Sequence, residues 1–310
     1  MRALVTGGCG FIGSVLVGKL REHGFRVDVV DDMSAGNLTK LVNAPLRVVP
    51  TDLISIYQHT AEIEEQGTNQ ILVFEGDFAH PLILNRIAQG TYTYVFHCAA
   101  DPRVQYSIQN PLGTTENNVT KTVALLSACA GAVSRFIFSS SAAVYGNRSG
   151  LIDEASGTKP ESPYSVSLRY FNVYGPGHDG KGAYATAVAS WCDALKSEKS
   201  LRSDGDGSQS RDMIYVDDVA EANLLAALHT DDLKGRTLNI CTGSKVSNNE
   251  ILRMIWKAWG PYERKNAPPR PGDIDHSLGD PVSAKGVLGF EAQTPFKVGL
   301  ELTLSWWGLL

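Results

Sequence analysis

Short apolar runs alternate with longer amphipathic stretches along the first part of the chain. Residues 2–6 (RALVT) are apolar and β-branched. A glycine-rich turn separates them from VLVGKLREHG, which has helical periodicity and is closed by Gly24. A second strand-like run, RVDVVDD at 26–32, follows directly. Together they predict a strand–turn–helix–strand unit of about 30 residues, the size of one βαβ crossover.

The same alternation continues toward the middle of the chain. A further helix is predicted at 114–131, and further strands are predicted at 48–50, 71–77, 94–100, 135–146 and 168–177. Strands that alternate with helices form a parallel sheet with helices on both faces. The sequence therefore predicts an α/β fold built on a doubly wound parallel sheet.

The pattern loosens after Gly175, which predicts a smaller, mostly C-terminal lobe. Helices are predicted at 183–198 and 217–229, with a turn cluster at 203–210 between them. Residues 260–281 are rich in proline and glycine and are predicted to form a loop. The predicted boundaries give 1–173 and 212–243 to the domain with the sheet, and 174–211 and 244–310 to the lobe.

Composition and charge exclude several classes of protein. The chain has 310 residues, 43% hydrophobic and 20% charged, so it can bury a large core without disulfide or metal staples. Its net charge of −5 provides no basic field for a phosphate backbone, and no nucleic acid partner is expected. The start MRALVTGG does not resemble a signal peptide, and no apolar run approaches the ~18 residues that cross a bilayer. A cytoplasmic protein without membrane contact is expected.

The cysteines predict free, mostly buried thiols rather than disulfides or a metal site. They are odd in number, lie far apart and form no CxxC pair. That usage is typical of a reducing compartment, and no metal is expected. The five are Cys9, Cys98, Cys129, Cys192 and Cys241.

The glycine turn has the chemistry of a dinucleotide site. Gly7, Gly10 and Gly13 follow a predicted strand and open a predicted helix, so the turn can be tight and the backbone can approach a pyrophosphate. Asp31 ends the second strand, where a carboxylate accepts both ribose hydroxyls and repels a 2′-phosphate. This predicts a Rossmann-type domain that binds NAD rather than NADP. Asp32 is the rival ribose ligand, and Asp31 is preferred because it lies nearer the strand end.

Further motifs extend along nearly the whole chain: TGGCGFIG (6–13), EGD (75–77), HCAADPRV (97–104), NNV (117–119), FSSSAAVYG (138–146), SPY (162–164), RYFNVYGPG (169–177), RDMIYVDDVAEAN (211–223) and PPRPGD (268–273). With these motifs the sequence resembles extended short-chain dehydrogenases/reductases, in particular the UDP-sugar 4-epimerases. The resemblance implies that the larger domain binds NAD and that the lobe binds a UDP-sugar.

The resemblance also implies individual binding roles. On the cofactor side, the glycine turn with Phe11 and Ile12 would bind the pyrophosphate, and Asp77 and Phe78 would lie beside the adenine. Ala99 and Ala100 would form the wall of the site beneath the cofactor, and Asn118 would order that wall. On the substrate side the residues are Asn172, the diphosphate arginines Arg211 and Arg270, the ribose- or uracil-side Asp273, and Ser277. Structural alternatives stay open: Asp77 could cap a helix, Arg211 could pair with Asp212 or Asp217, and Asn118 could serve only its helix or a strand end.

The catalytic pair implied by the resemblance is Tyr164 and Ser141. Tyr164 resembles the base that takes the proton of the sugar 4-hydroxyl, and Ser141 the hydroxyl that shares it; both would touch the substrate, and Tyr164 also the cofactor. NAD accepts the hydride and returns it, so C4 is inverted through a 4-keto sugar without net oxidation. The alternatives are a buried structural tyrosine and a turn serine at a strand end.

One departure from the family concerns the lysine expected four residues after the tyrosine. That position is Leu168, and YSVS runs straight into the next predicted strand. A lysine there would lower the pKa of the phenol, which is near ~10 when free. If Leu168 begins a strand at the far edge of the sheet, the chain would have to cover about 17 Å between two consecutive residues, whose Cα atoms are only ~3.8 Å apart.

Two explanations follow from this departure. In the first, which we favour, a segment of about two dozen residues is missing between Ser167 and Leu168 with the numbering closed over it, which predicts a break in the chain. In the second, the tyrosine loop is displaced and the protein is a catalytically impaired NAD- or nucleotide-sugar-binding protein.

The residues after Ser141 discriminate between reactions on this scaffold. Dehydratases of the group have an Asp-Glu pair there and decarboxylases a glutamate, whereas this chain has Ala142 and Ala143, which cannot do acid–base work. An epimerase is therefore favoured over a dehydratase or decarboxylase. The resemblance implies that position 277 sets the room beside the sugar, and the small Ser277 would leave space for a 2-acetamido group, so UDP-GlcNAc/UDP-GalNAc or the uronates are expected beside UDP-Glc/UDP-Gal. A homodimer is implied by the resemblance, through helices that include 114–130.

Overall fold

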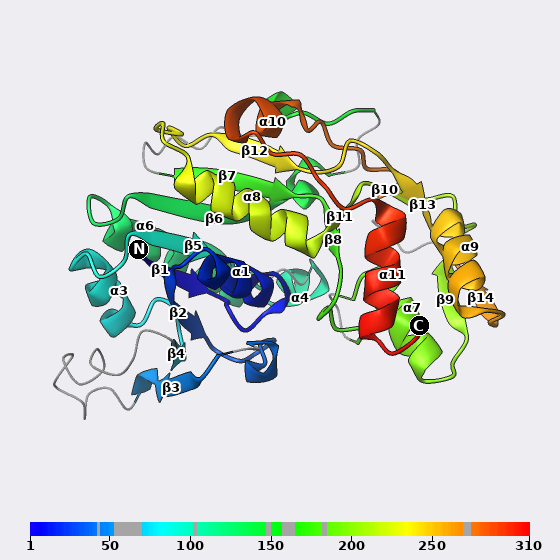
Figure 1. Cartoon of the computed structure of the whole chain (residues 1–310), viewed down its shortest axis with the longest axis horizontal. Helices are drawn as coiled ribbons and strands as arrows, with labels where there is room; N and C mark the ends of the chain where they lie inside the picture. Colours follow the sequence, from blue (N-terminus) through cyan, green and yellow to red (C-terminus); the bar gives the residue numbers. More distant parts are fainter. Residues whose placement is uncertain are drawn as a thin grey trace. The chain divides into compact units, whose positions relative to one another are not determined.

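The central sheet of the computed structural model has eight strands in the order β12-β7-β6-β5-β1-β2-β4-β3 (Figure 1). The structure describes residues 1–41, 44–52, 70–101, 104–146, 150–156, 165–181, 185–268 and 274–310. Every pairing recorded within this sheet is parallel. This confirms the predicted doubly wound α/β fold. The strands are β1 Arg2–Thr6, β2 Arg26–Asp31, β3 Leu46–Pro50, β4 Ile71–Glu75, β5 Tyr94–His97, β6 Arg135–Ser141, β7 Ser165–Tyr170 and β12 Thr237–Ile240.

The chain divides into two compact units by its internal packing. The first comprises Met1–Ser139, Glu161–Val166 and Ala226–Gly235, and the second comprises Ser140–Pro160, Ser167–Leu225 and Arg236–Leu310. This division reflects packing alone. The boundaries predicted from the sequence divide the chain by function and stay a prediction.

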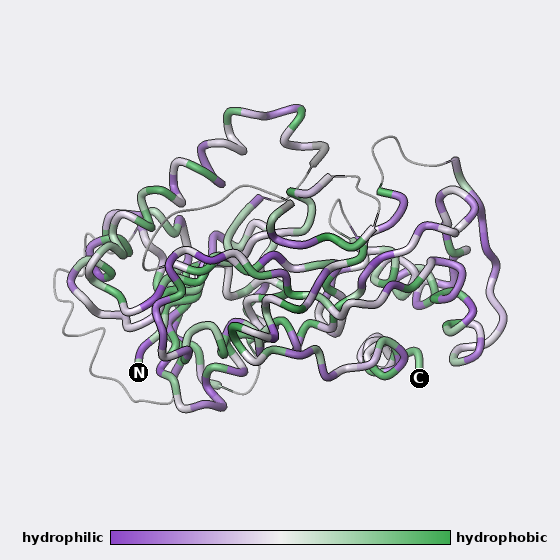
Figure 2. The backbone as a smooth tube through the Cα atoms, turned by 90° about the horizontal axis from the view of Figure 1, so that it is seen from above, coloured by the Kyte–Doolittle hydropathy of each residue, from purple (hydrophilic) through white to green (hydrophobic). Residues whose placement is uncertain are grey.

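The first unit has an apolar core because its strands are hydrophobic on both faces. Leu4, Phe74, Val95 and Phe136 from the strands are almost completely buried and lie in one cluster with Leu125. Apolar residues recur at helical spacing on the surrounding helices, and Figure 2 shows hydrophobic and hydrophilic residues alternating along helices in this way. These helices are α1 Phe11–Glu22, α3 Pro81–Ala88, α4 Val104–Gln109, α5 Pro111–Thr115 and α6 Lys121–Cys129, with a π-helical turn η3 at Glu116–Thr120 and a 3₁₀ turn η1 at Leu38–Lys40.

The second unit has its own core around Trp191, Ile255, Leu300 and Leu304. Its helices are α7 Ala187–Lys196, α9 Asn248–Trp259, α10 Val282–Leu288 and α11 Phe296–Trp306, and α8 Val216–Leu228 begins in it. Short strand pairs complete it: β8 Asn172–Tyr174 with β11 Met213–Tyr215, β9 Leu201–Asp204 with β14 Arg264–Ala267, and β10 Ser210–Arg211 with β13 Val246–Ser247. Two 3₁₀ turns lie at Ala142–Tyr145 (η4) and Glu154–Ser156 (η5).

Several sequence-based boundaries were wrong, including the ends of β4 at Glu75 and β5 at His97, which were expected at 77 and 100. β6 ends at Ser141 rather than at 146, because the Ser141 hydroxyl accepts the Ala143 N–H and starts η4. The predicted loop at 260–281 contains β14, which pairs with β9. β7 begins at Ser165 rather than at Leu168, because Val166 is buried like Leu168 and continues the alternation of the strand.

The position of the predicted break lies inside β7, and the missing segment itself stays a prediction. Ser167 and Leu168 pair with Thr237 and Leu238 as consecutive residues of β7. The strand is therefore continuous where the missing segment was expected, and Ser165–Ser167 serve as its first half.

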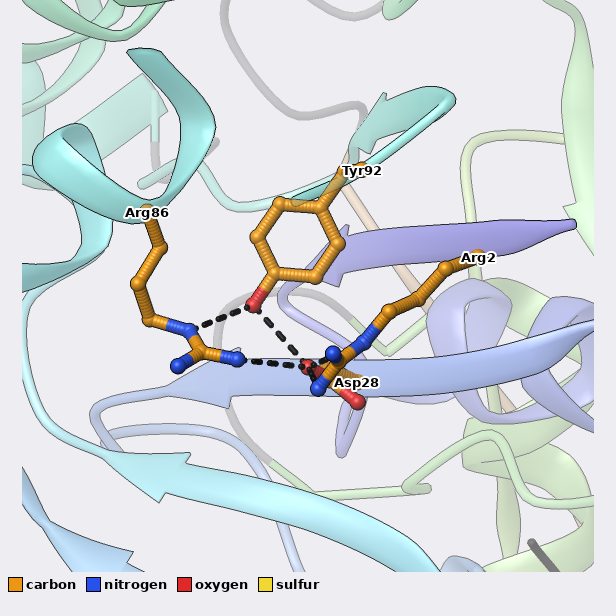
Figure 3. Close-up of polar contacts among 4 residues, drawn as sticks. All are labelled: Arg2, Asp28, Arg86 and Tyr92. Carbon is orange, nitrogen blue, oxygen red and sulfur yellow. Dashed lines mark hydrogen bonds and ion pairs between the residues drawn. The ribbon is translucent and has the colours of Figure 1, made fainter. Parts of the chain in front are cut away.

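A buried charged network ties the amino ends of β1 and β2 to α3 (Figure 3). Asp28, 1% exposed, accepts from Arg2 Nη2 at 2.7 Å and from the Tyr92 hydroxyl at 3.0 Å. Arg86 on α3 donates from Nε to the Tyr92 oxygen at 3.2 Å and lies 3.7 Å from the same Asp28 oxygen. A carboxylate this deeply buried is tolerated because two guanidinium groups and a hydroxyl surround it. Burial, followed by the charge of Asp28, raises the pKa of Tyr92.

Replacing Tyr92 with phenylalanine should lower the free energy of unfolding by ~1–3 kcal/mol, because Asp28 and Arg86 each lose a buried partner. Urea unfolding followed by circular dichroism measures the change. The matched control is Tyr94→Phe, which keeps the half-buried ring and its packing on Phe25 and should change stability by less than ~0.5 kcal/mol. Equal stability of the two variants would contradict the role given to the Tyr92 hydroxyl.

Candidate functional site

The carboxyl ends of four parallel strands meet at one edge of the sheet in the first unit. β1 pairs with β2 and β5, and β2 pairs with β4, all in parallel register. Gly7, Asp31, Asp77 and Ala99, all predicted to contact a cofactor, lie at or just after these strand ends. The structure therefore brings the predicted cofactor residues of the first unit to the edge where α/β folds bind ligands.

The glycine turn is packed so tightly that side chains cannot be added to it. Gly7 has a φ of +68°, and a Cβ on it would lie 2.8 Å from the Ala99 backbone nitrogen. A Cβ on Gly13, the third residue of α1, would overlap the carbonyl oxygen of Gly7. Gly10 donates from its N–H to the Gly7 oxygen at 3.1 Å and caps α1 without a side chain. Phe11 and Ile12 open α1 and are half-buried.

This turn fits the phosphates of a dinucleotide. The first turn of α1 has no acidic residue, and Gly10 provides no capping side chain, so the helix N-terminus can interact with an anion. A backbone without side chains can approach a pyrophosphate closely.

Replacing Gly13 with alanine should weaken NAD binding at least tenfold, because the Gly7 carbonyl and the turn must move to admit the methyl group. NAD released from the purified, denatured protein measures the occupancy. The matched control is Gly18→Ala on the same helix, where nothing lies within 4 Å of the added Cβ. That variant should keep its NAD and gain roughly 0.5–1 kcal/mol of stability. Full NAD occupancy in both variants would refute this function of Gly13.

Asp31 is tied directly to the glycine turn. Its carboxylate is 7% exposed and accepts the Cys9 N–H at 2.9 Å through Oδ2 and the Met33 N–H at 2.9 Å through Oδ1. Each oxygen keeps a further lone pair for a hydroxyl donor. Burial raises the pKa of Asp31, and the two N–H donors oppose that change. The rival, Asp32, is exposed and accepts from the backbone and side chain of Ser34 instead.

A buried histidine that the sequence analysis missed fixes the wall opposite the turn. Thr6 Oγ1 accepts the Ala99 N–H at 3.2 Å and lies 2.7 Å from His97 Nδ1, while His97 Nε2 lies 2.9 Å from Thr122 Oγ1. His97 is 2% exposed, and burial lowers its pKa to about 4. The neutral ring has one N–H, so it donates to one of the two threonine hydroxyls and accepts from the other. A polar residue at the end of an apolar strand, as in YVFHCAA, was the available signal.

Phe78 and Asn118 lie around the same wall. Phe78 is buried and meets the His97 ring edge-on at 4.9 Å. Asn118, in the π-helical turn η3, accepts the Asp101 N–H at 2.7 Å and donates Nδ2–H to the Asp101 carbonyl at 2.7 Å. These two hydrogen bonds fix the backbone of Asp101, which follows the half-buried Ala99 and the exposed Ala100. Asn118 therefore does not serve only its own helix, because it also holds the backbone of Asp101.

Asp77 does not cap α3, whose N-cap is His80. Its Oδ1 accepts the Ala79 N–H at 2.8 Å and its Oδ2 lies 2.7 Å from Lys121 Nζ. Asp77 therefore shapes the turn after β4 and keeps a partly exposed carboxylate at the sheet edge.

The predicted catalytic pair is only partly described. Ser141 is the last residue of β6 and is exposed, and its hydroxyl accepts the Ala143 N–H at 3.1 Å. It is thus a strand-end turn serine, as the alternative had it, whose oxygen also keeps its own proton to donate. Tyr164, Arg270 and Asp273 lie outside the described residues.

Three predicted substrate residues lie together in the second unit. Asn172 Nδ2 donates to Ser277 Oγ at 3.1 Å, and Ser277 is 7% exposed. Arg211 is half-buried and donates from Nη1 to the carbonyls of Ser210 and Asp275 at 3.1 and 3.2 Å. These backbone contacts hold the guanidinium group beside the segment 275–277.

Other predictions concern cysteines, metals and membranes. The five cysteines are free, and four of them are buried, as expected. Within the described ranges no cluster of three or more His, Cys, Asp or Glu residues could hold a metal ion. In the part of the chain that the structure describes, no helix is both long enough and apolar enough to cross a membrane.

Comparison with known proteins establishes the family. The model of the NAD dependent epimerase/dehydratase family matches residues 3–167 and 165–241. The UDP-glucose 4-epimerase of Mycolicibacterium smegmatis is 31% identical over 330 residues, covering 98% of each chain. The chain therefore belongs to the NAD dependent epimerase/dehydratase family, and its cofactor is NAD.

Solved structures agree with this assignment. The UDP-glucose 4-epimerase of Thermotoga maritima, determined with UDP-glucose, matches with a TM-score of 0.83 and 31% identity over 99% of both chains. The UDP-N-acetylglucosamine 4-epimerase of Methanobrevibacter ruminantium M1, in complex with UDP-N-acetylmuramic acid, matches with a TM-score of 0.82 and 30% identity over 98% of this chain and 97% of that one.

The family match is divided at the segment where the lysine was expected. Residues 165–167 are matched twice, once at the end of the first stretch and once at the start of the second. The alignment with the Mycolicibacterium smegmatis enzyme is 330 residues long, more than the 310 residues of this chain, so it contains gaps in this chain.

Proposed function

We propose that this chain is an NAD-dependent epimerase that inverts C4 of a UDP-hexose through a transient 4-keto sugar. The observation that carries the proposal is the glycine turn packed on Ala99 with Asp31 bonded to it, in a chain that aligns over 98% of its length with a UDP-glucose 4-epimerase. Bound NAD supplies the acceptor and donor of hydride.

The residues at the sheet edge divide the work of holding the cofactor. The turn Gly7, Gly10 and Gly13, with Phe11 and Ile12, binds the pyrophosphate, and Asp31 binds the adenosine ribose. Asp77 and Phe78 face the adenine, and Ala99, Ala100 and Asn118 form the wall beneath the dinucleotide. The Asn118–Asp101 pair and the His97 hydrogen bonds keep that wall in one conformation.

Acid–base chemistry falls to Tyr164 and Ser141. Tyr164 takes the proton of the sugar 4-hydroxyl and returns it at the end of the reaction, and Ser141 shares it by hydrogen bonding. The 4-keto sugar must turn within the site before C4 is reduced on its other face. Ala142 and Ala143 contribute no acid–base group, which disfavours a dehydratase or decarboxylase.

The substrate residues favour a UDP-sugar with space beside its C2. Arg211 and Arg270 bind the diphosphate, Asp273 the ribose or uracil side, and Asn172 the sugar. Ser277 is small, so a 2-acetamido group or a uronate is accepted beside UDP-Glc and UDP-Gal. The likeness to a UDP-N-acetylglucosamine 4-epimerase supports this range.

A second candidate function is NAD and nucleotide-sugar binding without turnover. β7 takes up Ser165–Ser167 directly after Tyr164, and the same residues are matched twice by the family model. Both observations favour a chain shortened after Tyr164, in which the lysine and its helix are absent. We therefore expect slow turnover, whereas the second candidate function predicts no turnover.

A homodimer is part of the proposal. Ile108, Leu112, Val119 and Val123 are between 55% and 84% exposed and recur at spacings of one or two helical turns along α4–α6. An exposed apolar stripe of this kind is covered by a partner in stable proteins, and a second copy of this chain is the proposed cover. Light scattering during gel filtration should give twice the mass of the chain.

The proposed activity is tested with the protein as purified and with no NAD added. UDP-galactose should be converted to UDP-glucose, measured by chromatography of the stopped reaction so that no NAD-consuming coupling enzyme is needed, and the Tyr164→Phe variant should show no conversion. An epimerase retains its NAD, whereas a simple alcohol dehydrogenase would exchange with free NADH. Binding of UDP with no conversion over a day would replace the proposal with the second candidate function.

A further inference from the structure

Asp212 is a buried carboxylate that the proposed mechanism does not use. It lies between β10 and β11 and has no exposed surface. Its Oδ1 accepts the N–H and the hydroxyl of Thr242 at 2.9 and 2.7 Å. Its Oδ2 accepts the N–H groups of Gly243 and Gly279 at 3.0 and 3.2 Å. Four donors from two separate loops therefore converge on one side chain.

The backbone of the same residue binds two of the predicted substrate residues. The Asp212 N–H donates to the Ser277 carbonyl at 2.9 Å. The Asp212 carbonyl accepts from the Asn172 backbone N–H at 3.1 Å and from Asn172 Nδ2 at 3.0 Å. Arg211, a predicted diphosphate ligand, is the preceding residue. Asp212 thus joins Arg211, Asn172 and Ser277 into one frame.

The carboxylate has no capacity left for a ligand. A carboxylate offers about four lone-pair positions, and Thr242, Gly243 and Gly279 supply four donors. Burial raises the pKa of Asp212, and these donors oppose that change. A buried charge is tolerated only when it is bonded in this way, and removing it would leave the backbone donors unsatisfied. Its contribution must therefore be indirect.

We propose that Asp212 is a positioning residue that sets the affinity of the chain for the UDP part of the substrate, by fixing Arg211, Asn172 and Ser277 relative to Thr242, Gly243 and Gly279. The proposal rests on the proposed function. It assigns to Asp212 no contact with the substrate or with NAD.

The test is titration calorimetry with UDP at 25 °C on the full chain and on Asp212→Asn. The amide has nearly the same shape, but its NH₂ group faces N–H donors where the carboxylate had accepted them. We expect UDP binding to weaken at least tenfold while the NAD content stays at the wild-type level. The matched control is Asp206→Asn, an exposed turn aspartate in the same unit that accepts from the N–H and hydroxyl of Ser208, and its UDP affinity should not change.

The outcomes separate positioning from mere stability. A lower melting temperature with unchanged UDP affinity at 25 °C would make Asp212 purely structural and overturn the inference. Should Asp212→Asn not fold, Thr242→Val removes one of the four donors, and a two- to fivefold weaker UDP affinity is expected against no change if the inference is wrong. Failure of the wild-type chain itself to bind UDP would overturn the proposed function as well.

Discussion

Inserting a lysine-bearing helical segment after Tyr164 should raise the rate of UDP-galactose epimerisation at least 10²-fold over that of the present chain. The segment is about two dozen residues long, enough for a crossover between parallel strands. It is a designed helical segment that places a lysine four residues after the tyrosine, the spacing that the family resemblance implies. It ends in a second copy of residues 165–167, so that β7 keeps its first half.

Two physical effects give this expected magnitude. A free phenol has a pKa near ~10 and is almost entirely protonated at neutral pH, whereas a nearby ammonium group lowers that pKa and makes the phenol a better base. General base catalysis is worth about 10²–10⁴ in rate. The insertion also lengthens the chain between Tyr164 and Ser165, the residue that begins β7 at the amino end of the strand. The glycine turn and Asp31 follow the carboxyl ends of their strands instead.

The matched control is the same segment with methionine in place of its lysine. It restores the length of the chain but not the charge, so its rate should stay well below that of the lysine insertion. NAD content and melting temperature are measured for both, to show that each protein is folded and loaded. If both insertions turn over no faster than the present chain, then neither the charge nor the chain length limits the reaction.

The strands and the cofactor turn could be predicted because their signals are local. The apolar runs of β1, β2 and β4 are buried on both faces, and the glycines of the turn have no room for a Cβ. The position of Asp31 followed from the end of β2, and the structure connects its carboxylate to Cys9 in the turn. Local sequence was sufficient wherever one strand or one turn determines the geometry.

The rest depends on contacts between distant residues. Ser165–Ser167 is a short polar–apolar–polar segment that suits either the loop after Tyr164 or the start of β7, and pairing with β12 decides for the strand. β14 forms because residues 264–267 meet β9. His97 and Asp212 were missed because their partners, Thr122 for the first and Gly279 for the second, lie 25 and 67 residues away. No local pattern indicates which buried polar group will find such partners.

His97 should make the protein lose roughly 3 kcal/mol of stability between about pH 6.5 and pH 4. Burial lowers the pKa of His97 to about 4 in the folded chain, from an ordinary value of 6.5. Between these two pH values the unfolded chain binds a proton that the folded chain does not. The stabilisation is therefore complete above pH 6.5, falls as the pH drops toward 4, and changes no further below that.

The comparison that isolates this effect is His97→Gln, since a glutamine amide can also donate to one threonine hydroxyl and accept from the other but does not titrate. Urea unfolding of both proteins at pH 7 and pH 4 gives the difference in free energy. Asp31 and Asp212, whose pKa values are raised by burial, act with the opposite sign over this range. Because both proteins contain these two carboxylates, their contribution cancels. Equal pH dependence in wild type and variant would mean that His97 takes up its proton within the fold, and that the wall beside Ala99 tolerates a charged ring.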